Sequence, residues 1–309
     1  MALQRDTFIA EIVRALAHDP SIMFLSADFG AEALDELRDR YPAHFLHCGI
    51  AEQAMIDVAA GLALEGRTVF VYAMAPFLSL RALEQIKCGP GLMDLPICLL
   101  SIGVGLGYAD AGPTHYATED FACLRAVVGT RVFTTADGDS AAALARHLLA
   151  TPEFAYVRLD RHDLPNLGAA MSAETITQGY RVFGEDTPTK VALVSHGRMV
   201  HTCVALASEF PDRFFAVDLL RAKPFPDALV ETLATAAGVV VVDEQTPSGS
   251  LPAAVFEGCA AQGAYPRIVP LTLPEQYVFQ NGGRVALLEG LGLSRDGVLA
   301  AALACRPPV

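Results

Sequence analysis

The sequence predicts an α/β protein built from two open, mostly parallel sheets with helices on both faces. Short apolar segments alternate with segments of helical periodicity along most of the 309 residues. The strand-like segments are apolar at successive positions, as strands are when helices cover both faces of a parallel sheet. A stretch without clear periodicity divides the chain into two such series, and the length suits two domains.

The first series occupies residues 1–165. Its expected strands are 21–28, 68–73, 96–103, 130–137 and 154–160. Its expected helices lie at about 6–18, 51–65, 77–88, 118–127 and 139–150. Because helices separate consecutive strands, the strands are expected to run parallel in one sheet.

Residues 166–188 are expected to form a linker, because proline, glycine and polar residues accumulate there. A second α/β domain is then expected over 189–309. Its expected strands are 190–197, 213–220, 238–245 and 266–273.

The composition excludes several classes of protein. A net charge of −13 argues against nonspecific binding to nucleic acid or to an anionic membrane. No segment approaches the roughly 18 uninterrupted apolar residues that a membrane span needs. Hydrophobic residues make up 52% of the chain and charged residues only 18%, which predicts extensive subunit contacts.

The seven cysteines are scattered, without a CxxC pair, so neither a zinc site nor a disulfide framework is indicated. The N-terminal segment MALQRDTFIAEIVRAL is amphipathic and contains acids, unlike a secretory signal peptide. These two features predict a reducing, cytoplasmic setting.

Glu52 is the first candidate functional residue. It opens a helical segment in the stretch HFLHCGIAEQAMIDVAAGLALEG, residues 44–66, whose inward positions are otherwise apolar. An acid in the first turn of a helix stabilises the helix dipole. It can also act as a proton donor, and spacing alone favours the structural interpretation.

His115 is the second candidate. It lies in IGVGLGYADAGPTHYATED, residues 102–120, after an expected strand. Ligands of open parallel sheets bind beyond the carboxyl ends of the strands, so an acid–base role is possible there. The alternative is a loop histidine that caps the next helix. The glycine spacing does not fit the GxGxxG pattern of nucleotide sites.

Two further groups combine arginine with strand ends. Tyr72 lies near the end of the expected strand 68–73, and Phe77 and Arg81 follow it; the aromatic residues suit the core, and Arg81 can share a helix face with Phe77. Arg158 and Arg161 close the expected strand 154–160, where arginine suits the binding of phosphate or carboxylate, or an interdomain salt bridge.

Taken together, these segments resemble the C-terminal half of the transketolase family, over about residues 5–300. The similar segments, in the order of the family, are HCGIAEQAM, APFLSLRALEQIK, GPTHYATEDFACLRAV, TTADGDSAAALARHLL, YVRLDRHDLPNL and LPEQYVFQNGGR. The resemblance implies a pyrimidine-binding (Pyr) domain at 1–165 and a transketolase C-terminal domain at 189–309, the latter supporting assembly more than chemistry.

The resemblance also implies a thiamine diphosphate cofactor. Glu52 matches the glutamate that hydrogen-bonds N1′ of the aminopyrimidine and activates it, and burial of a carboxyl group favours the protonated form that this needs. Ile50 belongs to the same motif. Phe77, or with less support Tyr72, resembles the aromatic residue that stacks on the pyrimidine. Arg81 matches an arginine near that ring in the deoxyxylulose-phosphate synthase branch.

For the substrate, the resemblance implies contacts from three residues. His115 matches the substrate-facing histidine of GPTH, and Arg161 matches an arginine that holds substrate phosphate. Asp110 stands one position before the place where the family has an aspartate, which here is Ala111.

The diphosphate-binding half of the family's enzymes has no counterpart here, since the chain lacks GDG followed by Asn. The chain also starts where the Pyr domain starts. We therefore expect a split enzyme whose N-terminal partner subunit holds the diphosphate and Mg²⁺. The expected assembly is an α2β2 heterotetramer that contains a dimer of this chain and acts on small sugars.

Of the family's phosphate-binding residues, only Arg161 and Arg5 have matches here. The first expectation is a two-carbon ketol transfer from a ketose (phosphate) to an aldehyde or aldose. The alternatives are decarboxylative carboligation of pyruvate or another 2-oxo acid, and a non-catalytic regulatory subunit. The enlarged loop 103–112 is expected either to cover the substrate or to pack against the partner.

Overall fold

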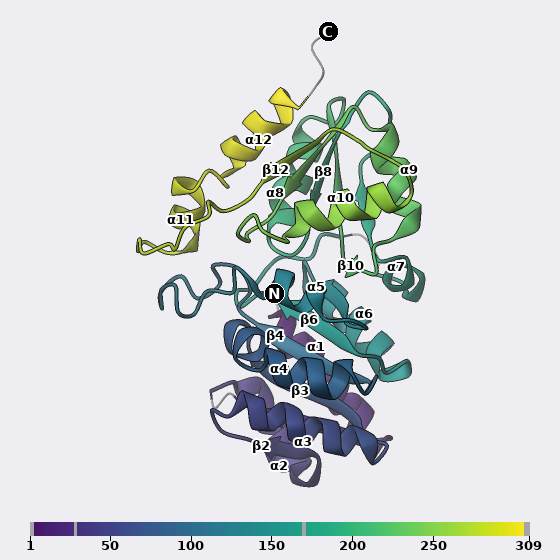
Figure 1. Ribbon diagram of the computed structural model, residues 1–309, viewed down its shortest axis with the longest axis vertical. Helices are drawn as coiled ribbons and strands as arrows, with labels where there is room; N and C mark the ends of the chain where they lie inside the picture. The colour runs from purple at the N-terminus through teal and green to yellow at the C-terminus, as the bar shows by residue number, and fades with distance from the viewer. Residues whose placement is uncertain (1–2, 28–29, 169–170, 306–309) are drawn as a thin grey trace. The chain divides into compact units, whose positions relative to one another are not determined.

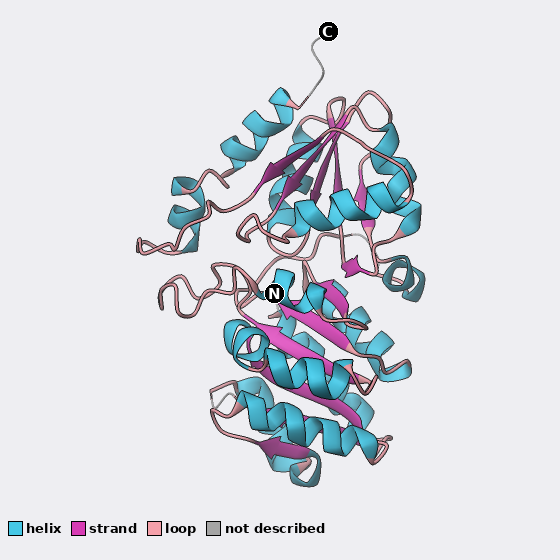
Figure 2. Ribbon diagram, in the orientation of Figure 1, coloured by secondary structure: helices cyan, strands magenta, loops and turns pink. Residues whose placement is uncertain are grey.

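A computed structural model describes residues 3–27, 30–168 and 171–305. The chain divides into two compact units. The first unit comprises Met1–Val104 and Cys123–Ala173, and the second comprises Gly105–Ala122 and Glu174–Val309. Both units are α/β (Figures 1 and 2), which confirms the predicted fold class.

The first unit contains a parallel sheet. Its strands are β1 (Ile22–Ser26), β2 (Phe45–His47), β3 (Thr68–Met74), β4 (Ile97–Ile102), β5 (Arg131–Thr134) and β6 (Ala155–Leu159). They lie in the order β5-β6-β4-β3-β1-β2, and every neighbouring pair is parallel. Strand β3 is central, with Val71 in register between Leu25 and Leu99. The carboxyl end of β3 therefore leads directly from the core of the sheet into the candidate site.

Helices cover both faces of this sheet, with α3 and α4 in front of it and α1 behind it in Figure 1. The helices of this region are α1 (Gln4–Leu16), η1 (Glu32–Leu34), α2 (Asp35–Arg40), η2 (Pro42–His44), α3 (Glu52–Leu64), η3 (Phe77–Arg81), α4 (Leu83–Ile86), η4 (Lys87–Gly91), α5 (Asp120–Ala126) and α6 (Gly138–Ala150). Helix α1 packs against α6, and α3 packs against β3.

The prediction of a single α-helix over 77–88 is wrong, because the segment is mostly π-helical. Phe77–Arg81 and Lys87–Gly91 are π-helical turns, and only Leu83–Ile86 between them is α-helical. Pro90 lies inside the second π-turn, where its missing N–H cannot continue an α-helix. Short π-helical insertions recur at functional sites, and the first of these two carries Phe77 and Arg81.

The second unit contains a smaller sheet, formed by β7 (Arg181–Phe183), β8 (Val191–Ser195), β9 (Phe214–Asp218), β11 (Gly238–Val242) and β12 (Ile268–Leu271). The strand order is β12-β11-β8-β9-β7, with β7 antiparallel and the others parallel. Its other elements are α7 (Ala173–Gln178), α8 (Met199–Glu209), β10 (Arg221–Lys223), α9 (Asp227–Thr235), α10 (Leu251–Ala261), α11 (Arg284–Gly290) and α12 (Arg295–Ala304).

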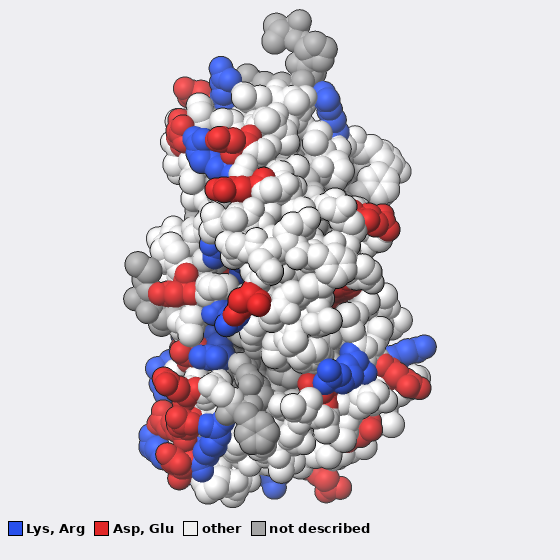
Figure 3. All heavy atoms as spheres, turned by 90° about the vertical axis from the view of Figure 1, so that its left-hand side faces the viewer, with Lys and Arg blue, Asp and Glu red and all other residues white. Residues whose placement is uncertain are grey.

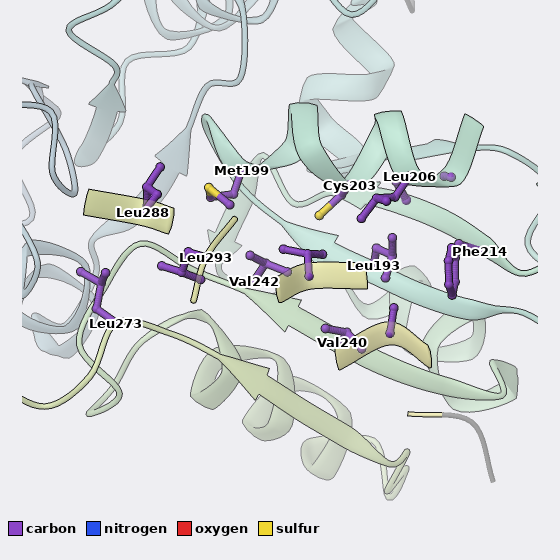
Figure 4. Packing of buried hydrophobic residues seen from close by; sticks show 14 of the residues in the cluster. Leu193, Met199, Cys203, Leu206, Phe214, Val240, Val242, Leu273, Leu288 and Leu293 are labelled. Carbon is purple, nitrogen blue, oxygen red and sulfur yellow. The ribbon is translucent and has the colours of Figure 1, made fainter. Parts of the chain in front are cut away.

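The core of this unit lies between the sheet and helices α8, α11 and α12. Figure 4 shows Leu193, Phe214 and Val240 from the strands packed beside Cys203 and Leu206 from α8. All five side chains are at most 1% exposed. Burial of each large apolar side chain contributes roughly 1.5–3 kcal/mol to folding, so this core stabilises the second unit.

Part of the stretch expected as a linker is ordered. Helix α7 and strand β7 lie between 173 and 183, and β7 pairs with β9 through Arg181, Val182 and Phe183. A three-residue edge strand is too short to produce a recognisable alternation of apolar and polar residues. Regular structure of the second unit therefore begins before the expected start at 189, while the domain boundaries themselves stay predictions.

Figure 3 shows one face of the molecule, on which charged side chains gather in separate groups with broad uncharged areas between them. This pattern agrees with the charged content of 18%. Within the described residues, no helix combines the length and the apolarity that crossing a membrane would require.

Candidate functional site

Glu52 is buried at the start of α3, with only 3% of its surface exposed. The preceding turn uses Gly49 at φ +70°, in the left-handed region that favours glycine, and Ala51 supplies no side-chain cap. Oε2 of Glu52 accepts a hydrogen bond from Nη1 of Arg81 at 2.7 Å. The carboxyl group therefore lies both at the positive end of a helix and beside a guanidinium.

This pairing alters one expectation. The sequence predicts apolar surroundings for Glu52, and the buried face of α3 is indeed apolar, with Met55, Ile56 and Ala59 completely buried. The charged partner comes from η3, twenty-nine residues along the chain. Helical periodicity cannot reveal a partner on another element.

Phe77 and Arg81 form the second part of the site. Both lie on η3, directly after β3, and the guanidinium carbon of Arg81 is 4.4 Å from the centroid of the Phe77 ring. This is a cation–π contact. The structure thus brings together three residues predicted from the sequence, Glu52, Phe77 and Arg81, from two different elements.

The other two residues predicted to contact the cofactor, Tyr72 and Ile50, are not part of this contact. Tyr72 is completely buried within β3, with its ring 6.2 Å from that of Phe24. The less favoured assignment of Tyr72 as the stacking residue therefore has no support, because its ring offers no free face. Ile50 is 76% exposed just before α3, so its side chain is available for contact with a ligand or another chain.

His115 lies in a loop that belongs to the second unit. The loop leaves β4 and closes on itself through a bridge between Gly105 and Ala117, whose N–H groups donate to each other's carbonyl oxygens at 3.0 and 2.9 Å. Nδ1 of His115 is 2.9 Å from Oγ1 of Thr114, and its backbone N–H donates to the carbonyl of Gly112 at 2.9 Å. The imidazole is partly exposed.

Asp110 is exposed in the same loop, five residues before His115. Tyr116 is buried beneath it, and its hydroxyl lies 3.5 Å from the carbonyl oxygen of Ala109. Burial raises the pKa of the Tyr116 hydroxyl, and the negative charge of Asp110 acts in the same direction. Tyr116 therefore stays neutral at physiological pH and serves as an apolar support of the loop.

A cavity of about 340 Å³ adjoins this loop within the second unit. Tyr116, Leu273 and Val278 supply buried apolar lining, and Glu119 and Glu275 supply carboxylates. The first unit has a larger groove, of about 620 Å³, lined by residues that include Lys87, Leu92 and Val128.

The arginines that could bind phosphate lie in different environments. Arg158 is 2% exposed inside the first unit and donates to Oγ1 of Thr134 at 3.2 Å, so it stabilises the sheet. Arg161 is partly exposed just beyond β6. Nε of Arg5 is 2.6 Å from Oδ1 of Asp6. Of these three arginines, Arg158 is buried, whereas Arg5 and Arg161 are both partly exposed.

Sequence reasoning missed the residues that follow β11. Asp243, Glu244 and Gln245 are 1%, 7% and 1% exposed, although all three are polar. They lie at the carboxyl end of a parallel strand, and this position was the available signal. In the sequence they resemble an ordinary strand–helix connection, because their partners are distant along the chain.

The described residues contain no group of three or more His, Cys, Asp and Glu side chains that could hold a metal ion.

The sequence was compared with models of known protein families. Residues 4–166 match the family model described as the transketolase pyrimidine-binding domain. The chain belongs to the transketolase family, as the motifs around Glu52, Phe77 and His115 predicted.

Individual relatives are similar at lower identity. The chain is 26% identical to one subunit of the apulose-4-phosphate transketolase of Phocaeicola vulgatus, over 97% of this chain and 96% of that protein. It is 30% identical to 1-deoxy-D-xylulose-5-phosphate synthase of Myxococcus xanthus, over 97% of this chain but 51% of that protein. The chain thus spans about half the length of the synthase.

Solved structures agree on the fold. A structure described as a split gene transketolase, in an inactive β4 tetramer, matches with a TM-score of 0.87 and 25% identity, over 99% of this chain and 98% of that one. Transketolase of Pichia stipitis in complex with sedoheptulose 7-phosphate matches with a TM-score of 0.80 and 17% identity, over 98% of this chain and 46% of that one.

Proposed function

We propose that this chain is one subunit of a split, thiamine-diphosphate-dependent enzyme of the transketolase kind. The observation that carries the proposal is the contact between buried Glu52, Arg81 and the ring of Phe77. It places a carboxylate and an aromatic face around one planar group, which is what an aminopyrimidine ring requires.

The guanidinium of Arg81 supports this fit. It is planar and carries N–H donors, it lies over Phe77, and it donates to Glu52. An aminopyrimidine ring needs the same two contacts, a hydrogen bond to a carboxyl group and an aromatic ring beside it. The residues present therefore suit this part of thiamine diphosphate.

In the proposed reaction each residue has one task. Glu52 would hydrogen-bond N1′ of the aminopyrimidine and hold a proton there, Phe77 would stack on the ring, and Arg81, which fills both contacts here, would move beside the bound ring. When bound, the cofactor supplies the electron sink for cleavage of a carbon–carbon bond. His115 and Asp110 contact substrate hydroxyl or carbonyl groups, and Arg161 binds a substrate phosphate.

A separate partner subunit is proposed to hold the diphosphate and Mg²⁺. The match to a single subunit of the Phocaeicola transketolase, over nearly the full length of both chains, supports this division of the active site. The similar fold of a split gene transketolase supports it as well. We propose an α2β2 assembly with a central dimer of this chain.

The proposed reaction is transfer of a two-carbon ketol unit from a ketose phosphate to an aldehyde or aldose. One relative, which matches over 96% of its own length, is a transketolase named for apulose 4-phosphate, and this supports a phosphorylated ketose. Decarboxylative carboligation of a 2-oxo acid is the second candidate. It is favoured by the 30% identity to the deoxyxylulose-phosphate synthase.

One experiment separates these reactions. This chain is mixed with a candidate partner that carries GDG followed by Asn, together with thiamine diphosphate and Mg²⁺, and is supplied with an aldehyde and either a ketose phosphate or pyruvate. Ketol transfer predicts product from the ketose phosphate without CO2. Product and CO2 from pyruvate alone would replace the first reaction by the second.

A further inference from the structure

The residues that follow β11 hold the loop that carries His115. Residues 105–122 group with the second unit by their contacts, although they follow β4 of the first unit in sequence. Residues 243–246, which we call the anchor segment, supply these contacts at the base of the loop. Their partners are Gly105, Ala117 and Thr118.

Gln245 makes the central contact. Its side chain is 1% exposed, and Nε2 donates to the carbonyl oxygen of Ala117 at 2.7 Å and to that of Glu244 at 3.4 Å. Both partners are acceptors, so only the NH2 group of the amide can face them. Ala117 also closes the loop with Gly105, and Gln245 therefore fixes the point where the two ends of the loop meet.

Glu244 supports the same point from the other side. Its carboxylate accepts from Nε of Arg284 at 2.7 Å and also from Nη2, and both residues are at most 7% exposed. A Cβ atom on Gly105 would lie 2.6 Å from Oε2 of Glu244. The Glu244 carboxylate thus lies close to the loop backbone at Gly105, and Arg284, the first residue of α11, holds the carboxylate in place.

Thr246 makes the third contact. Its backbone N–H and its hydroxyl both donate to the carbonyl oxygen of Thr118, at 3.0 and 3.1 Å. Asp243 anchors the segment itself, since Oδ2 accepts from the N–H of Leu251 at the start of α10, at 2.8 Å. The anchor segment is therefore tied to a helix on one side and to the loop on the other.

We propose that Glu244, Gln245 and Thr246 are positioning residues for the reaction, and that the second unit acts through them on the loop of His115. The inference rests on the proposed function, because it assumes that His115 contacts substrate. The anchored residues Ala117 and Thr118 follow His115 by two and three positions. Loss of the anchor should move the imidazole without touching the cofactor residues.

Hydrogen exchange tests the anchor on this chain alone. Gln245→Met removes the donor and adds no charge, and Gln262→Met, at an exposed position after α10, is the matched control. The amides of His115 and Ala117, which donate within the loop, should exchange about five- to tenfold faster in Gln245→Met. Amides of β8 and β11 should keep their protection, and the control should change neither set.

Thr246→Val is a milder second variant, because it loses the hydroxyl and retains the backbone hydrogen bond to Thr118. It should accelerate the loop amides about two- to fivefold. Unchanged exchange of these amides in both variants would show that the anchor segment does not hold the loop, and would overturn the inference.

Kinetics of the complex with the partner test the link to substrate. Gln245→Met should raise KM for the sugar substrate about five- to tenfold, with unchanged affinity for thiamine diphosphate. A large loss of cofactor affinity would instead indicate general damage and contradict positioning. If His115→Ala impairs turnover while Gln245→Met loosens the loop without changing KM, positioning is wrong and the role of His115 stands.

A failure of the proposed function would give a different result. The wild-type complex would then turn over neither donor, or His115→Ala would have no effect, whatever the exchange experiment shows. The two hypotheses therefore fail in different measurements.

Discussion

Arg81 links two parts of the site, since its Nη1 is 2.7 Å from Oε2 of Glu52 and its guanidinium carbon is 4.4 Å from the centroid of Phe77. The side chain of Arg81 is 40% exposed, whereas that of Glu52 is 3% exposed. A solvent-accessible cation thus compensates a buried acid, and the two residues are expected to respond differently to substitution.

Glu52→Gln should reduce turnover of the complex with the partner by about 10²- to 10⁴-fold, because an amide cannot hold an exchangeable proton against N1′. The measurement is kcat at saturating thiamine diphosphate. Glu65→Gln, at the other end of α3, is the matched control and should retain full activity. Full activity of Glu52→Gln would mean that this chain does not supply the acid, and would favour a non-catalytic subunit.

Arg81→Met should lower the free energy of unfolding by about 1–2 kcal/mol, since it leaves the buried Glu52 carboxylate without its counter-charge. Urea denaturation of this chain measures the change. In a Glu52→Gln background the same substitution should cost less than half as much. The control is Arg40→Met, which breaks an exposed ion pair with Glu36 and should cost about 0.5 kcal/mol or less.

Gly105→Ala should lower the free energy of unfolding by about 2–3 kcal/mol. Gly105 has a φ of +60°, and a methyl group there would lie 2.6 Å from Oε2 of the buried Glu244. Gly66→Ala separates the two causes, because Gly66 has a φ of +80° and no atom within 4 Å of the added Cβ. Equal costs at the two positions would show that the Glu244 contact adds nothing.

Cys203 should resist alkylation at pH 8, whereas the exposed Cys88 should react. Burial raises the pKa of the Cys203 thiol to about 12, with a smaller contribution from the charge of Asp218, and only a thiolate reacts readily. Mass spectrometry after a short treatment with iodoacetamide tests this. Equal modification of both cysteines would show that the second unit opens readily.

The same thiol should make stability depend on alkaline pH. Because its pKa is higher in the folded chain than the ordinary value of 9.0, the unfolded chain loses the proton first as pH rises. The contribution of Cys203 is therefore complete below pH 9 and should decline by about 1.4 kcal/mol per pH unit between pH 9 and pH 12. Denaturation of wild type and Cys203→Ala at pH 8, 9 and 10 measures the difference in slope.

Much of the fold was predictable because strand and helix periods are local properties. The apolar runs that became β1, β3, β4, β8, β9 and β11 stand out because helices cover both faces of a parallel sheet. The short strands β7 and β10 were missed, since three residues cannot show a period. The π-turn at Phe77–Arg81 was missed because its residues are ordinary helix formers.

Among the site residues, Glu52, Phe77 and Arg81 were predicted through the family motif, and the structure brings them together. Tyr72 was the alternative stacking residue, and its complete burial counts against it. Gln245 was not predicted, because a buried glutamine after a strand has no distinctive local pattern. The catalytic role of Glu52, the cofactor contacts of Phe77, Arg81 and Ile50, and the roles of His115, Asp110 and Arg161 at the substrate all stay predictions.

The sequence by itself determined the two α/β units and the family, because these depend on residue order over short segments and on a set of ordered motifs. Only the tertiary structure decided which polar groups meet. Arg81 reaches Glu52 across 29 residues, and Gln245 reaches Ala117 across 128. Such pairs form where the packing of α3 on its sheet, and of the loop on the second unit, closes long stretches of chain and buries polar groups that must then find partners.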